Sequence, residues 1–146
     1  MALERTITMF VGEDKNLTFE IFDQAGQTED ELEAAITAGT ATMQDVAGWT
    51  FEFLVRLKDK TVGTPLIDKS SGSPTEISVT GTYNATRATN TQRVVVSLFD
   101  TDTAASDGSS VVLAPKTYRY SLKRTDAGGE TILTYGDFEL LQATAR

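Results

Sequence analysis

Residues 49–57 alternate strictly in side-chain type, and this segment limits the possible folds more than any other part of the chain. Large apolar residues occupy every second position: Trp49, Phe51, Phe53, Val55 and Leu57. The residues between them are Thr50, Glu52, Leu54 and Arg56. Because successive side chains of a β-strand point to opposite faces of a sheet, the apolar set predicts a strand with one face in a core. We expect Trp49, Phe51, Phe53 and Val55 to form one buried row.

Shorter segments with the same alternation recur along the chain. We expect further strands around residues 3–9, 17–22, 66–67, 77–79, 94–98, 118–122 and 132–141, separated by turn sequences. Thr and Ser together supply 32 of the 146 residues, and these residues favour strands and turns, respectively. The pattern predicts an all-β protein: an antiparallel β-sandwich of about seven to eight strands in a single domain, residues 1–146.

Two details of this sandwich allow more than one arrangement. The first two strands are joined by the short polar turn 12–16, so they form either a hairpin or a crossing between the two sheets. Gly136 lies inside the last predicted strand and predicts a bulge or a close backbone approach there.

The segment 23–47 departs from the strand pattern and predicts a helical insertion. Thr28 and Glu31 have the spacing of a capping box, and Gly39 stands where a helix favours a C-terminal glycine. The residues at helical spacing between them are Leu32, Ala35 and Ile36. We expect one short amphipathic α-helix over 29–38, whose apolar edge must pack on another surface. The acidic residues of its first turn oppose the helix dipole, which favours a structural role over acid–base chemistry.

The chain contains no histidine and no cysteine. This excludes disulfides, thiolate nucleophiles and sulfur-ligated metals, and it removes the usual general base near neutral pH. The sequence has no glycine-rich phosphate loop or nucleophile elbow. We therefore expect no catalytic residues, no cofactor and no metal site, and we interpret the chain as a non-enzymatic protein.

One acidic segment leaves a metal site open as an alternative. Asp100, Asp102 and Asp107 suggest a calcium loop, but Ala104 and Ala105 stand where an EF-hand needs an oxygen ligand and a glycine. We expect a solvated turn, with an irregular oxygen-ligated cation site near residues 100–107 as the alternative.

Charge and hydropathy narrow the possible partners. The net charge is −8, so the surface should repel nucleic acid and anionic lipid. No apolar stretch approaches the ~20 residues that span a bilayer, and the first residues do not resemble a signal peptide. We expect no nucleic-acid or membrane partner and synthesis in the cytoplasm.

Four segments resemble small immunoglobulin-like modules of tailed-phage virions. They are residues 8–19, 48–53, 113–124 and the closing hairpin 125–140. Segment 113–124 is similar to the family's Leu-x-Pro-Gly-x-Tyr strand entry, with Lys116 in place of the glycine. The resemblance implies an immunoglobulin-like antiparallel β-sandwich that binds other virion subunits and performs no chemistry.

The relatives in question are capsid decoration (cement) proteins and the N-terminal modules of baseplate upper proteins. We favour a capsid decoration protein, located in the virion, bound to capsid or tail proteins and present as a homo-oligomer. The alternative is a baseplate or tail-fibre adaptor. A carbohydrate-binding module is a further alternative, but it needs exposed aromatic residues, whereas the alternation buries them.

Partner contacts are expected on the N-terminal arm 1–10 and on the insertion 23–47. The arm begins to alternate at once and could add as a strand to a neighbouring sheet. The insertion offers an apolar helix edge beside an acidic first turn. The predicted partner-binding residues are Leu3, Arg5, Ile7, Glu29, Leu32 and Ile36.

The buried row generates a direct test. Replacing Phe53 by Ala should lower the free energy of unfolding by about 3–5 kcal/mol, because it empties an aromatic site in a core. Urea unfolding of the two proteins measures this difference. A loss below ~1 kcal/mol would mean that the row faces solvent.

Overall fold

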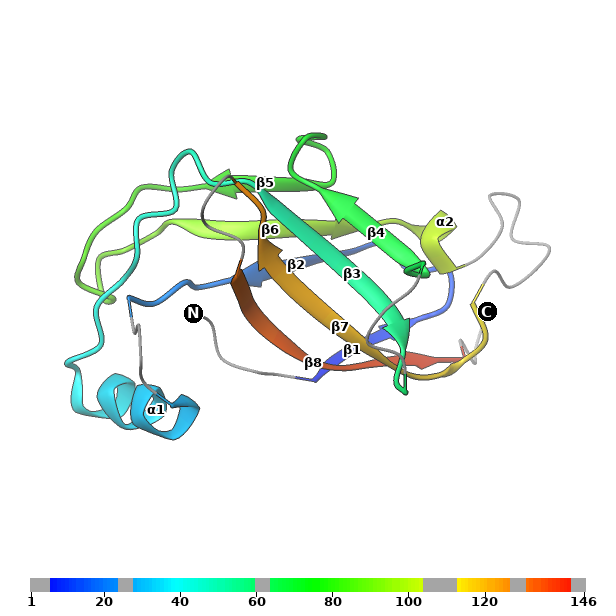
Figure 1. Cartoon of the computed structure of the whole chain (residues 1–146), viewed down its shortest axis with the longest axis horizontal. Helices are drawn as coiled ribbons and strands as arrows, with labels where there is room; N and C mark the ends of the chain where they lie inside the picture. The colour runs from blue at the N-terminus through cyan, green and yellow to red at the C-terminus, as the bar shows by residue number, and fades with distance from the viewer. Residues whose placement is uncertain (1–5, 24–27, 60–63, 104–112, 127–130, 143–146) are drawn as a thin grey trace.

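The computed structural model of the chain describes residues 6–23, 28–59, 64–103, 113–126 and 131–142, which form eight strands and two helices (Figure 1). In chain order these are β1 (Ile7–Phe10), β2 (Lys15–Phe19), α1 (Glu29–Ala38), β3 (Phe51–Leu57), β4 (Ile67–Ser70), β5 (Ile77–Thr80), β6 (Arg93–Leu98), α2 (Asp100–Thr103), β7 (Lys116–Arg124) and β8 (Thr131–Leu141). The predicted β-sandwich with one short inserted helix is confirmed. The one-turn helix α2 is an addition to it.

The strands form two sheets in the arrangement of an immunoglobulin-like sandwich. One sheet has the order β1-β8-β7-β3-β4 and the other has the order β2-β6-β5. Strands β2, β6 and β5 thus pair as strands B, E and D do in immunoglobulin domains, while β3, β7 and β8 pair as C, F and G do. Strand β4 pairs with the free side of β3 in the five-stranded sheet, as strand C′ pairs with strand C in variable-type domains.

The first two strands lie in different sheets, so the crossing alternative holds and the hairpin does not. Strand β1 instead pairs in parallel with β8, from Ile7 opposite Phe138 to Phe10 opposite Leu141. The prediction of a wholly antiparallel sandwich is wrong for this pair. The chain leaves β1 for the other sheet, so β1 lies at the edge of its own sheet, beside the last strand of the domain.

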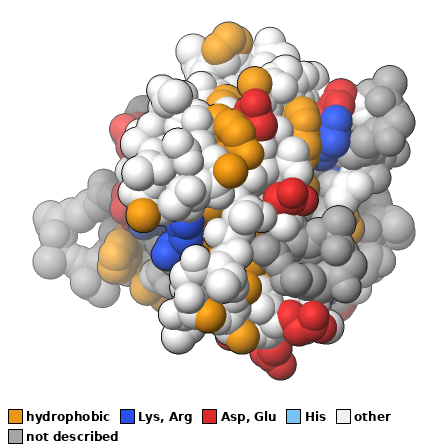
Figure 2. All heavy atoms as spheres, turned by 90° about the vertical axis from the view of Figure 1, so that its left-hand side faces the viewer, with side chains coloured by type: hydrophobic (Ala, Val, Ile, Leu, Met, Phe, Trp, Pro, Cys, Tyr) orange, Lys and Arg blue, Asp and Glu red, His pale blue; other side chains and the backbone are white. Residues whose placement is uncertain are grey.

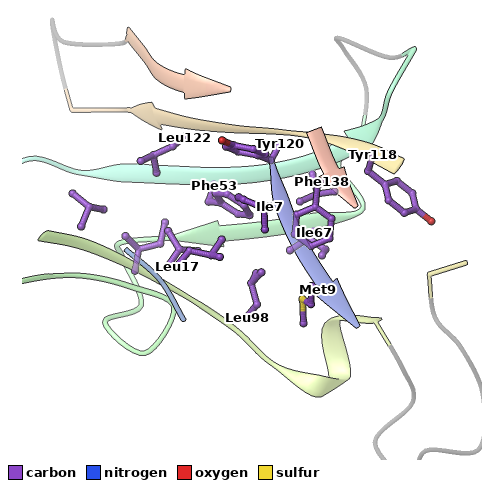
Figure 3. Close-up of a cluster of buried hydrophobic side chains, with 14 of the residues drawn as sticks. Ile7, Met9, Leu17, Phe53, Ile67, Leu98, Tyr118, Tyr120, Leu122 and Phe138 are labelled. Atoms are coloured by element: carbon purple, nitrogen blue, oxygen red, sulfur yellow. The ribbon is translucent and has the colours of Figure 1, made fainter. Parts of the chain in front are cut away.

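The main core lies between the two sheets and is centred on the predicted row of β3. Phe51, Phe53 and Val55 are at most 1% exposed. Figure 3 shows Phe53 between Tyr120 of β7 and Leu17 of β2, and the rings of Phe53 and Tyr120 stack with centroids 5.7 Å apart. Trp49 corrects the prediction, because it precedes β3 and only partly covers the core. Its ring lies beneath the guanidinium of Arg124, 3.8 Å from the centroid.

A buried tyrosine fixes the start of β7. The Tyr118 hydroxyl donates a hydrogen bond of 2.6 Å to the carbonyl oxygen of Ala114, four residues earlier. Burial raises the pKa of this hydroxyl. A tyrosine bonded back to the preceding backbone at this corner is a hallmark of immunoglobulin-like sandwiches. It lies in the segment 113–124 that carries the family resemblance.

Strand β8 contains a bulge, but not at Gly136. The register with β7 shifts between Leu122 and Lys123, so that Leu133 is the extra residue in β8. Gly136 lies opposite Tyr120, three residues after the bulge.

Helix α1 has the predicted bounds and the predicted caps. The Thr28 hydroxyl accepts a hydrogen bond of 3.2 Å from the backbone N–H of Glu31. Gly39 ends the helix with φ 75°, a left-handed conformation that glycine adopts without steric cost. Both signals are local in sequence, which is why the helix could be placed to the residue.

A buried ion pair ties β4 to α2. The alternation of β4 points Lys69 inward beside Ile67, and its ammonium lies 2.9 Å from the Asp102 carboxylate. The two side chains are 5% and 17% exposed, and the same ammonium lies 4.6 Å from the Phe99 ring centroid. The pair bridges the two sheets, because β4 belongs to one sheet and α2 follows directly on β6 of the other.

Removing one partner of this ion pair should cost more stability than removing the other. Asp102→Asn should lower the free energy of unfolding by about 3 kcal/mol or more, because it leaves the buried ammonium without a counter-charge. Lys69→Met should cost less than half as much, because it removes the buried charge and leaves a carboxylate that still accepts the N–H of Phe99. Urea unfolding compares the two variants. An equal or larger loss for Lys69→Met would contradict this account of the pair.

Candidate functional site

The insertion and the β5–β6 connection meet at one end of the sandwich and build the candidate site there (Figure 1). Segment 41–44 lies between two other chain segments. On one side, the N–H of Asp23 donates to Thr42 O at 2.9 Å and the N–H of Gln44 donates to Ile21 O at 3.0 Å. On the other side, the N–H of Met43 donates to Ala85 O at 2.9 Å. The insertion is therefore hydrogen-bonded to the β5–β6 connection rather than hanging free.

A second, smaller hydrophobic core lies under helix α1. It consists of Phe22, Leu32, Ala41 and Met43, with Ala35 and Ile36 packed against it. It is separate from the main core between the sheets. The predicted packing of the helix edge is confirmed, and its counterpart is the chain itself.

This packing corrects part of the predicted partner surface. Leu32 is completely buried in the small core, so it offers nothing to a partner. Ile36 is half-buried and lines a groove, and Glu29 is half-buried in the first turn of α1. Ile7 is also removed from the predicted partner surface, because its side chain points from β1 into the main core and is 8% exposed. Leu3 and Arg5 lie outside the described residues.

The end of the insertion is fixed by one buried glutamine. The Gln92 carbonyl oxygen accepts the N–H of Val46 at 3.1 Å, and its amide donates to the Asp45 carboxylate at 3.1 Å. The same carboxylate accepts the N–H of Ala47 at 3.0 Å. The hydrogen bonds from Ala47 and Gln92 lower the pKa of Asp45. Gln92 directly precedes β6, so it connects the insertion to the sandwich.

The opposite wall of the site is the connection 81–92, which folds tightly on itself. The N–H of Thr91 donates to Thr82 O at 3.0 Å, and the side-chain oxygen Oδ1 of Asn90 accepts the N–H of Asn84 at 2.8 Å. Gly81 has φ 79°, and a Cβ there would lie 2.0 Å from Thr91 O. Any side chain at residue 81 would therefore push this turn apart.

A groove of about 540 Å³ runs between the two walls. It is lined by Glu20, Ile36, residues 39–42, residues 85–88 and Arg93. The main ionic contacts in the groove are made by Glu20. Its carboxylate lies 3.0 Å from the guanidinium of Arg87 and 3.3 Å from that of Arg93. Viewed from this end, the surface is mostly uncharged and polar, with small separate apolar and charged areas (Figure 2). The groove thus offers methyl groups, hydroxyl groups and paired charges.

A second groove of about 620 Å³ continues from the first along β1 and β2. The two share Glu20, Arg87 and Arg93. This second groove follows the edge of β2 that faces away from β6, where no other strand of the described residues pairs with it. The predicted involvement of the arm 1–10 concerns this region, but residues 1–5 lie outside the described part.

The neighbouring turn after β7 is held by a charged pair. Arg124 contacts Asp126 through two hydrogen bonds of 2.8 and 2.7 Å, and these hold the pKa of Asp126 at about 2. The same carboxylate accepts the N–H of Thr50 at 3.2 Å, which joins the turn to the residue before β3. These contacts fix the segment that follows the insertion.

The acidic segment after β6 provides no cation site in the described residues. Within them, no three potential metal ligands lie together. Asp102 is engaged by Lys69 and by the N–H of Phe99, and Asp14 accepts the N–H of Asp100. Asp107 lies in 104–112, outside the described residues, so the alternative cation site there stays a prediction. Neither helix of the described residues is long and apolar enough to cross a membrane.

Sequence reasoning located the insertion but missed its counterpart. Residues 80–91 are mostly polar and show no apolar alternation, and nothing in that pattern pairs them with 41–44. The roles of Gln92, Arg87 and Glu20 depend on contacts across 46 or more residues. Gly81 was the one local signal that a tight turn begins there.

Comparison with known proteins gives no further assignment. A scan against protein-family models finds no match. A search of curated protein sequences finds none either.

Proposed function

We propose that this chain is a non-enzymatic structural protein of a tailed-phage virion that binds other virion subunits, in the role of a capsid decoration or cement protein. It would assemble in the host cytoplasm and form a homo-oligomer in the virion. The immunoglobulin-like strand order and the tyrosine corner in 113–124 support the family resemblance on which the virion assignment rests. The binding role is supported by the end groove.

The observation that carries the binding role is the separate core of the insertion. Of the described residues of 23–47, only Val46 belongs to the main core, and the others pack instead against Phe22 and the connection 81–92. No residue of α1 belongs to the main core, so packing between the two sheets does not explain why the helix is held there. A shaped groove on a fixed frame is what a protein-binding surface needs, since little conformational entropy is lost when a partner docks.

Copy number distinguishes the two virion roles. Quantitative mass spectrometry of gradient-purified particles, from the phage that carries the gene, should find this protein at a copy number comparable with that of the major capsid protein. A few copies per particle, co-purifying with tails, would support the baseplate or tail-fibre adaptor instead. Absence from purified particles would contradict both virion roles.

A bulky residue in the groove tests the contact surface. Ala88 lines the groove and is exposed, so Ala88→Trp should leave the fold intact and lower the occupancy of the protein on particles about tenfold or more, because the ring fills the space of the partner. Ala34→Trp is the matched control, on an exposed position of α1 that does not line the groove. Circular dichroism checks folding, and mass spectrometry measures occupancy. Equal occupancy of the two variants would place the interface elsewhere.

A further inference from the structure

The two sheets have β1, β4, β2 and β5 as their edge strands, and the chain itself blocks three of these edges. At the edge of β1, the N–H of Phe10 donates to the Glu13 carboxylate at 2.8 Å, and the Phe10 carbonyl oxygen accepts the N–H of Glu13 at 3.1 Å. At the edge of β4, the N–H of Ser70 donates to the Glu76 carboxylate at 3.1 Å, and the Ser70 carbonyl oxygen accepts the N–H of Ser73 at 3.2 Å. Such contacts keep a sheet edge from pairing with another chain.

The edge of β5 is blocked in the same way. The N–H of Ile77 donates to Ser73 O at 3.2 Å. The main-chain groups of successive residues point to opposite sides of a strand. Among the described residues of these three strands, each edge therefore keeps one unused outward N–H, at Thr8, Asp68 and Val79. A single N–H is too short a template for a second strand.

Strand β2 points a longer series of main-chain groups away from its neighbour β6. In β6, the N–H of Ser97 donates to Glu76 O beside β5 at 2.7 Å, so the main-chain groups of Val96 point the other way, toward β2. Leu17 lies opposite Val96 in the register and therefore turns its own groups toward β6. The groups of its neighbour Thr18 point to the open side.

Three alternate residues share this orientation: Asn16, Thr18 and Glu20. No described residue makes a hydrogen bond to their main-chain groups. They extend over about 14 Å of strand, and the groove of about 620 Å³ between β1 and β2 runs beside them. Within the described part of the chain, β2 is thus the edge that is open over more than one residue.

We infer that this edge of β2 pairs with the same edge of a second copy, so that the two three-stranded sheets of a dimer become one continuous sheet. A second copy has the same three edges blocked, so β2 is the edge of matching length that it can offer. Like edges pair antiparallel about a two-fold axis. The inference names the interface of the proposed homo-oligomer and to that extent rests on the proposed function.

The side chains of β2 are complementary to themselves in this arrangement. With the two-fold axis at Thr18, Thr18 lies opposite Thr18 of the second copy, and Asn16 lies opposite Glu20. All three open residues are then paired, and each pair exchanges two main-chain hydrogen bonds. An axis at Glu20 would bring two carboxylates together, and an axis at Asn16 would place Glu20 beyond the start of the partner strand.

The charged residues around the edge are of both signs: Glu13, Asp14, Lys15, Glu20, Arg87 and Arg93. The two arginines hold the Glu20 carboxylate within each copy. Along the paired strands, the two copies of this cluster lie about 14 Å apart, which exceeds the Debye length of ~8 Å at physiological salt. No like charges of β2 lie opposite each other in the register centred on Thr18. Main-chain pairing and side-chain register, rather than net charge, therefore select the second copy.

Self-association of the full chain tests the inference. Sedimentation equilibrium should show a monomer–dimer equilibrium with a Kd in the micromolar range or tighter. In the same concentration series, amide exchange followed by NMR should show protection of Asn16, Thr18 and Glu20 that rises with the fraction of dimer.

Three results would overturn the inference. A chain that stays monomeric up to about 1 mM would do so, and so would a dimer that leaves these amides unprotected. Protection of the same amides in the monomer is the third, because another segment of the same chain would then cover the edge. The virion role is decided separately by the copy number on particles, so the two proposals can fail independently.

Two proline variants test the main-chain pairing. Thr18→Pro removes the outward N–H at the two-fold axis and should weaken dimerisation about tenfold or more. Val79→Pro is the matched control, because the N–H of Val79 also points to the open side of an edge strand, in the same sheet. It should leave the Kd within about twofold. An equal effect of the two variants would overturn the assignment of β2.

Substitutions of the exposed Asn16 test the register without changing the main chain. Asn16→Glu places a carboxylate opposite Glu20 of the second copy and should weaken dimerisation about tenfold, because the contact occurs twice in the dimer. Asn16→Lys should leave dimerisation unchanged or strengthen it. The same two changes at Ala34, an exposed position on α1, control for net charge and should leave the Kd within about twofold. Asn16 variants that differ no more than the Ala34 variants would overturn the pairing.

Discussion

The inward row of β3 is the constraint on which the rest of the structure depends. Because Phe51, Phe53 and Val55 must face the second sheet, the pleat of the strand also determines which side chains point outward. The register then passes this choice to the neighbours of β3. Tyr118, Tyr120 and Leu122 of β7 are placed inward, and Arg119, Ser121 and Lys123 are placed outward. A shift by one residue would exchange the buried and the outward-facing side chains of the sheet.

Local signals made part of this structure predictable. The caps of α1, at Thr28 and Gly39, are read within four residues of the helix, and the helix has the predicted bounds. The alternation of β3 was also local, and it identified the buried row except for Trp49, which lies before the strand. What alternation cannot supply is the partner of each strand. The parallel pairing of β1 with β8 joins residues 131 positions apart, and no local pattern encodes it.

The buried ion pair could not be read from the sequence pattern. Lys69 follows the alternation of β4 and therefore points inward, but a lysine in a polar stretch reads as exposed because its burial needs a counter-charge from a distant segment. That counter-charge is Asp102, which the sequence placed in an acidic turn. In the candidate site the same reasoning applies to Leu32, whose partners Phe22 and Met43 come from segments on either side of the helix. The insertion could be located from the sequence, but not the direction in which its apolar edge faces.

The central claim of this account is that the insertion is a fixed frame for the end groove rather than a loose loop beside a finished sandwich. Amide hydrogen exchange of the whole chain, followed residue by residue by NMR, tests it most directly. The amides of Met43 and Gln44, which donate to Ala85 O and Ile21 O, should exchange at least about a hundredfold more slowly than in an unstructured peptide. Exchange of both amides at the unstructured rate, while the amides of β3 stay protected, would contradict the account.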